Sequence, residues 1–144
     1  MRVRDICTHW MDAINSNSSL SDAARHMRDR NVGFLPVLDE DNVLAGVVTD
    51  RDIVVRGLAE AKNPIGTSVG EIMSTDVFTC SEDDSVDEAA RLMEHQQIRR
   101  LVVIDVDGKA VGILSLGDVA TKAHTEVLVG EAVEQISQPC EPRR

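Results

Sequence analysis

An internal repeat constrains the fold of this chain more than any other feature. The segment Ala23–Met27 (AARHM) recurs as Ala89–Met93 (AARLM), at an offset of 66 residues (89 − 23). The same offset carries Gly46 onto Gly112, and the alignment between these points needs no gap. A register kept over this length indicates a duplicated structural unit, because repeated units bury their open faces against each other.

Each repeat follows the order β-α-β-β-α. The first helix is predicted to start at a capping box, Ser19–Asp22 in one repeat and Ser85–Glu88 in the other. Apolar residues at helical spacing follow each box. The predicted strands, from pattern and turn residues, are Ala13–Ile14, Phe34–Leu38 and Leu44–Val48, and then Thr79–Cys80, Leu101–Ile104 and Ala110–Leu114.

This order predicts an α/β fold of the α+β type, in which each repeat forms a three-stranded sheet with two helices on one face. The other face would stay uncovered, so the two repeats are expected to pack together with pseudo-twofold symmetry. The expected domains are repeat 1 at 1–62, a linker at 63–68 and repeat 2 at 69–124. A C-terminal helix and tail at 125–144 is expected to be partly disordered.

Composition limits the function classes. The net charge of −10 argues against a nucleic-acid partner or an anionic membrane surface, since both require an extended basic face. No segment reaches the roughly 18 to 20 apolar residues of a membrane span, and no secretory signal is visible. The three cysteines, Cys7, Cys80 and Cys140, lack C-x-x-C spacing, which favours reduced thiols and a cytoplasmic location.

One short motif follows the last strand of each repeat. It runs from Gly46 to Asp52 and from Gly112 to Asp118. The pairs Thr49-x-x-Asp52 and Ser115-x-x-Asp118 have a structural interpretation as helix capping boxes. They also have a functional interpretation, because a strand, a tight turn and a helix start present free amides to an anion. The Asp would repel a phosphate, so its expected partner is a ribose diol.

With these motifs, the chain from about Val3 to Lys122 resembles a pair of CBS domains, the Bateman module. The resemblance implies clefts between the repeats that bind an adenosine-containing ligand, namely AMP, ADP, ATP, NAD or S-adenosylmethionine, with no cofactor required. It also implies a homodimer and a regulated partner protein that reads ligand occupancy.

The resemblance assigns roles to individual positions in this sequence. Asp52 and Asp118 would bond the ribose, and Thr49 and Ser115 would lie near ribose or phosphate. The adenine would lie among the early strands and the segment that follows the first helix. These adenine positions are Ile14, Cys80, Phe34, Leu35 and Pro36.

The repeats differ where a phosphate would need positive charge. Arg51 corresponds to Gly117, and Arg99 and Arg100 correspond to Gly33 and Phe34. We expect these three arginines to converge on the phosphates of one ligand and the two clefts to be inequivalent. The alternative is that they are solvated surface charges, the usual place of arginine. Arg56 and Lys62 are further candidates.

Two other functions compete with ligand sensing. A structural dimerisation module with no ligand would keep the same fold. An enzyme would need a catalytic motif, and the sequence shows no nucleophile elbow, no P-loop and no Cys/His pair in a family context. His9, His26, His95 and His124 lack metal-ligand spacing, so no metal site and no catalytic residue is predicted.

Overall fold

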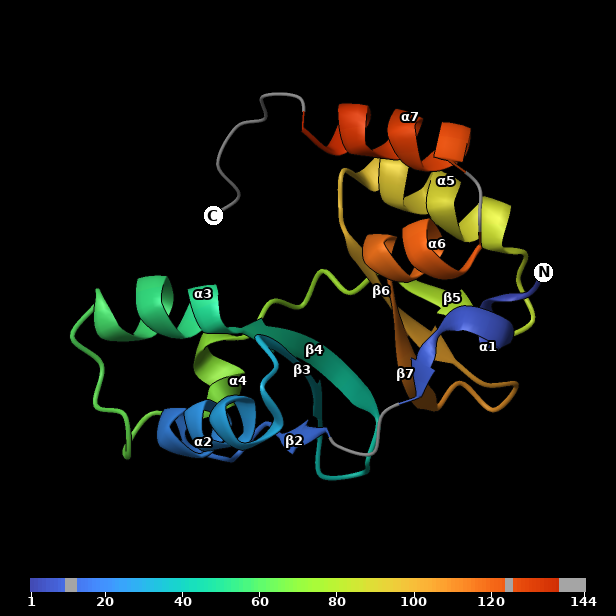
Figure 1. Cartoon of the computed structure of the whole chain (residues 1–144). Helices are drawn as coiled ribbons and strands as arrows, with labels where there is room; N and C mark the ends of the chain where they lie inside the picture. Colours follow the sequence, from blue (N-terminus) through green and yellow to red (C-terminus); the bar gives the residue numbers. More distant parts are fainter. Residues whose placement is uncertain (10–12, 124–125, 138–144) are drawn as a thin grey trace. The chain divides into compact units, whose positions relative to one another are not determined.

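The computed structural model describes residues 1–9, 13–123 and 126–137, with the backbone alone for 126–129. The chain forms two compact units (Figure 1). The α5 unit comprises Met1–Trp10 and Phe78–Arg144, and the α2 unit comprises Met11–Val77. The mixed α/β fold predicted from the sequence is confirmed.

The α2 unit contains a three-stranded sheet with the order β2-β3-β4. Strand β2 (Ile14–Asn15) is parallel to β3 (Phe34–Leu38), which is antiparallel to β4 (Leu44–Thr49). These strands follow the predicted β-α-β-β order. Helix α2 (Leu20–Arg30) connects β2 to β3, and the one-turn helix α4 (Val69–Ile72) completes the unit.

The α5 unit contains a four-stranded sheet, so the prediction of three strands is wrong here. Strands β5 (Thr79–Ser81), β6 (Arg100–Ile104) and β7 (Ala110–Ser115) repeat the arrangement of the α2 unit. The N-terminal strand β1 (Thr8–His9) adds to the edge of β7, with Thr8 opposite Ile113. In the α2 unit the equivalent contact is a single bridge, Val47 with Ser74.

The start of each sequence repeat packs in the unit that holds the body of the other repeat. Helix α1 (Val3–Ile6) belongs to the α5 unit, where the Val3 amide donates to the Asp84 carbonyl at 2.9 Å. In the α2 unit the Val69 amide donates to the Ser18 carbonyl at 2.8 Å, and both residues lie 66 positions earlier or later than their counterparts. Packing thus divides the chain differently from the predicted boundaries 1–62, 63–68 and 69–124, which stay a prediction about the duplicated segments.

Both first helices have matching ends. Helix α2 is capped by Ser19, whose hydroxyl accepts from the Asp22 amide at 3.1 Å, and helix α5 (Val86–Gln96) by Ser85, which accepts from the Glu88 amide at 3.1 Å. They end at Asn31 (φ 53°) and Gln97 (φ 54°), which are also 66 residues apart. The predicted capping positions are confirmed, and the repeat extends to the backbone conformation.

The second helices differ between the repeats. In the α2 unit, α3 (Asp50–Asp52) continues as a π-helical segment, η1 (Ile53–Leu58), in which the Ala59 amide donates to the Val54 carbonyl at 2.8 Å. In the α5 unit, α6 (Leu116–Lys122) is a regular α-helix. The rise in residues per turn within η1 therefore marks one departure from the repeat.

The predicted C-terminal helix is present as α7 (Glu126–Ile136), which packs along α5 (Figure 1). Ala132 is fully buried in the core of the α5 unit, and Gln97 Nε2 donates to the Gln135 carbonyl at 3.1 Å. The predicted disordered tail and Cys140 lie outside the described residues. Among the helices that are described, none has the length and apolar character needed to cross a bilayer.

Candidate functional site

The two motif hydroxyls lie at equivalent strand ends. Thr49 pairs with Phe34 across β4 and β3, and Ser115 pairs with Arg100 across β7 and β6. A main-chain hydrogen bond closes each end, from the Leu116 amide to the Arg99 carbonyl at 2.9 Å in the α5 unit. The sheet register therefore places the motif beside the strand entry, as the sequence argument requires.

Both motifs form complete capping boxes. The Ser115 hydroxyl accepts from the Asp118 amide at 3.0 Å, and Asp118 Oδ2 accepts from the Ser115 amide at 2.9 Å. Thr49 and Asp52 make the same two bonds, each at 3.0 Å. The capping interpretation is confirmed. A carboxylate oxygen has more than one lone pair, so the ligand interpretation stays compatible with these bonds.

A cation on the same helix faces the remaining oxygen of each motif carboxylate. Lys122 Nζ donates to Asp118 Oδ1 at 3.1 Å, and Arg56 Nε lies 3.9 Å from Asp52 Oδ1. The carboxylate side chains are 14% and 17% exposed, respectively. Each carboxylate is thus largely buried and paired with a cation, which offsets the cost of desolvating its charge.

One hollow in the α5 unit brings together three of the predicted site residues. Arg99, Arg100 and Ser115 line a space of about 430 Å³. The start of α6 and the last part of α7 supply its other walls, through Leu116, Gly117, Ala120, Val133, Ile136 and Ser137. Two arginines beside an apolar wall suit a ligand that carries both an anionic group and an apolar group.

The other predicted residues are placed apart from this hollow. Arg51 is exposed at the start of α3 in the α2 unit, so its convergence with the α5-unit arginines stays a prediction. Ile14 and Leu35 belong to the hydrophobic core of the α2 unit, and Cys80 belongs to that of the α5 unit. Phe34 is half-buried and Pro36 is buried. Contact between these five residues and an adenine also stays a prediction.

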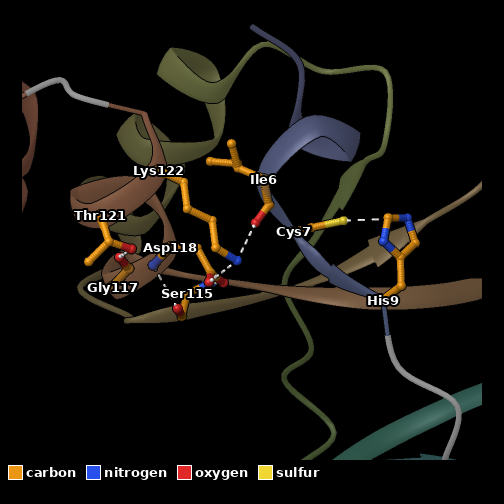
Figure 2. A network of polar contacts seen from close by, with 8 residues as sticks. All are labelled: Ile6, Cys7, His9, Ser115, Gly117, Asp118, Thr121 and Lys122. Atoms are coloured by element: carbon orange, nitrogen blue, oxygen red, sulfur yellow. Dashed lines mark hydrogen bonds and ion pairs between the residues drawn. The ribbon is translucent and has the colours of Figure 1, made fainter.

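The two described thiols are buried and protonated. Burial raises the pKa of the Cys80 thiol to about 12, and burial followed by the charge of Asp118 raises the pKa of Cys7. Cys7 Sγ lies 3.9 Å from His9 Nε2 (Figure 2). Because the thiolate is the reactive form, these cysteines are poor nucleophiles at neutral pH. Within the described residues no group of His, Cys, Asp and Glu has a metal-binding arrangement.

The motif glycines allow close approach of a crossing segment. A Cβ on Gly112 would lie 2.6 Å from the Thr8 carbonyl oxygen, and a Cβ on Gly46 would lie 2.6 Å from the Ser74 carbonyl oxygen. Any side chain here would displace the segment from the other sequence repeat. The glycine of the motif is therefore needed for packing.

Sequence reasoning missed two parts of this site. Lys122 is the repeat counterpart of Arg56 and lies four residues after Asp118, so helical spacing could have identified it. The α7 wall, Val133, Ile136 and Ser137, gave no signal because the sequence does not say where a terminal helix docks.

Comparison with known proteins identifies the family. The CBS domain family model matches residues 3–58 and 69–124. The CBS domain-containing protein YhcV of Bacillus subtilis is 37% identical over 135 residues, covering 94% of each chain. The chain belongs to the CBS domain family and contains a tandem pair of these domains.

Solved structures of similar chains include ligand complexes. CBSX2, a CBS-pair protein of Arabidopsis thaliana, has been solved with AMP; it is 31% identical, with a TM-score of 0.72 over 85% of this chain and 95% of that one. The CBS domain pair of MJ0100, solved with 5′-methylthioadenosine and S-adenosylmethionine, is 33% identical, with a TM-score of 0.69 over 83% and 93%. Hypoxic Response Protein I, solved with two coordinated zinc ions, is 33% identical, with a TM-score of 0.73 over 83% and 97%.

Proposed function

We propose that this chain is a regulatory module that binds an adenosine-containing small molecule and signals its occupancy to a partner protein. The hollow beside Ser115 carries this proposal, because it gathers Arg99 and Arg100 at the motif strand end. Its cations suit a phosphate or carboxylate, and its apolar α7 wall suits a purine or another apolar group.

The relatives support the ligand class. CBSX2 has been solved with AMP, and MJ0100 with two other adenosine derivatives. All three molecules contain adenine and a ribose 2′,3′-diol. In this chain we assign the diol to Asp118 and Asp52, since a carboxylate can accept from both hydroxyls. AMP, ADP, ATP and NAD are the proposed ligands that also carry phosphate.

The two motif sites are proposed to be inequivalent. The motif in the α5 unit has Gly117 after Leu116 and two arginines at the strand entry. The motif in the α2 unit has Arg51, with Gly33 and Phe34 at the strand entry. We expect the α5-unit site to hold a phosphate-bearing ligand more tightly, because a pair of cations faces its hollow.

Ligand identity can be tested on freshly purified full-length protein. Mass spectrometry of released small molecules identifies any carried ligand. Thermal unfolding with AMP, S-adenosylmethionine or 5′-methylthioadenosine at about 100-fold excess over the dissociation constant should raise the midpoint, since that excess stabilises by about 2.7 kcal/mol. A purely structural dimerisation module would show no shift with any of the three.

Two variants test the assigned site. Arg99→Ala and Arg100→Ala should each weaken AMP binding about tenfold in titration calorimetry, since a charge-assisted bond contributes about 1.5 kcal/mol or more. Arg28→Ala is the matched control, because Arg28 forms an exposed pair with Asp29 in the other unit. Unchanged AMP affinity in both site variants would contradict the assignment.

A further inference from the structure

Two cations at equivalent positions of the repeat connect the motif to the main chain of a crossing segment. Lys122 and Arg56 are 66 residues apart (122 − 56), and each follows its motif aspartate by four residues. Besides its bond to Asp118, Lys122 Nζ donates to the Ile6 carbonyl at 3.1 Å (Figure 2).

Arg56 makes the corresponding connection in the α2 unit. One guanidinium nitrogen donates to the Ile72 carbonyl at 3.3 Å and to the Met73 carbonyl at 3.4 Å. Ile72 and Ile6 are themselves 66 residues apart (72 − 6). The connection is therefore built twice, from a lysine in one repeat and an arginine in the other.

Each connection joins parts of both sequence repeats within one compact unit. Asp118 and Lys122 belong to the second repeat, whereas Ile6 ends the one-turn helix α1 at the start of the first. A four-residue helix has little stability of its own, so α1 depends on such tertiary contacts. The Lys122 bond is one of them, and it depends in turn on the position of the Asp118 carboxylate.

We propose that Lys122 and Arg56 are positioning residues that link ligand occupancy at Asp118 and Asp52 to the stability of helices α1 and α4. This inference rests on the proposed function. The cation fixes the carboxylate for the ribose and neutralises its charge, which would otherwise oppose a nearby phosphate. A ribose hydroxyl that donates to Oδ1 adds to the lysine bond, because one oxygen can accept both.

The coupling is reciprocal. A ligand that fixes the Asp118 carboxylate also fixes Lys122 and its bond to Ile6, so binding protects the end of α1 from opening. By thermodynamic linkage, removal of the lysine weakens both the hold on α1 and the affinity for ligand. Loss of charge compensation penalises an anionic ligand more than a neutral one.

The experiment compares Lys122→Met with Lys122→Arg in the full-length chain. Methionine keeps the apolar stem and removes the charge, whereas arginine is the residue that the other repeat uses. Lys109→Met, at an exposed turn position of the same unit, is the matched control. Calorimetry with AMP and with 5′-methylthioadenosine measures affinity, and hydrogen exchange reports the Cys7 amide, which donates to the Val3 carbonyl at 2.9 Å.

Lys122→Met is expected to weaken AMP about tenfold and 5′-methylthioadenosine by less than about threefold. AMP should slow exchange at Cys7 in the native chain and in Lys122→Arg, and this effect should be lost in Lys122→Met. Equal weakening of both ligands, or native AMP affinity in Lys122→Met, would overturn the inference and leave the proposed function standing. A native chain that binds neither these ligands nor S-adenosylmethionine would overturn the proposed function itself.

Discussion

Replacing Gly112 with alanine tests whether the motif glycine serves the packing of the N-terminal strand. The added Cβ would lie 2.6 Å from the Thr8 carbonyl oxygen, 3.3 Å from the Thr8 carbonyl carbon and 3.4 Å from the His9 Cα. All three atoms are backbone, so no side-chain rotation relieves the contact. Strand β1 has to move away from β7.

The cost of this substitution follows from the contacts that β1 loses. Overpacking a tight site costs about 1 to 3 kcal/mol, and each lost strand hydrogen bond adds about 0.5 to 1.5 kcal/mol. We expect the free energy of unfolding of the α5 unit to fall by about 3 kcal/mol. For a chain of this size that corresponds to a melting midpoint about 10 °C lower.

Urea unfolding and hydrogen exchange measure this effect together. The exchange of residues 3–9 should accelerate in Gly112→Ala, because α1 and β1 share that segment. Gly117→Ala is the control: its Cβ meets only Ser115 Oγ, at 3.5 Å, and alanine favours the helix by about 1 kcal/mol. A loss of less than about 0.5 kcal/mol in Gly112→Ala, with native protection of β1, would refute the reasoning.

Three further predictions concern the thiol, the terminal helix and the cap. Burial raises the pKa of Cys80 from its ordinary 9.0 to about 12, so above pH 9 the unfolded state releases a proton that the folded state keeps. The unfolding free energy should therefore fall as pH rises, by about 2 kcal/mol between pH 9 and 10.5, and urea titrations of Cys80→Ala should lack this dependence. Ala132→Asp should lower stability by about 2 to 3 kcal/mol and speed exchange along α7, because a fully buried site receives a charge, whereas Gly130→Ala, with nothing within 4 Å of its Cβ, should raise stability by up to about 1 kcal/mol; equal midpoints would contradict this packing of α7. Ser115→Ala should cost about 1 kcal/mol in urea unfolding through loss of the α6 cap, and an unchanged midpoint would show that the hydroxyl bond contributes nothing.

The features that depend on neighbouring residues were predictable from the sequence. Ser19 and Ser85 cap their helices as expected, and the strand Phe34–Leu38 has its predicted bounds. The motif hydroxyls at Thr49 and Ser115 also lie at the predicted strand ends. In each case the signal is a short-range pattern whose partner lies within a few positions along the chain.

The features that depend on distant contacts were not predictable. Val3 and Ile6 align with Val69 and Ile72, but the alignment does not say which body each pair joins. Both choices bury the same apolar side chains, so periodicity cannot decide between them. The wall that α7 adds to the hollow depends on the same kind of long-range docking. These two contacts change the sheet of the α5 unit and complete its candidate site.

The crossing of the two repeat starts has a consequence for how the chain can be cut or assembled. A fragment ending at residue 62 would lack α4, whose Val69 and Ile72 belong to the core of the α2 unit. Residues 11–77 contain that core in one piece. Two molecules of a single ancestral repeat could have traded these short heads, as domain-swapped dimers do. Fusion of the two copies would then turn a concentration-dependent association into an intramolecular one.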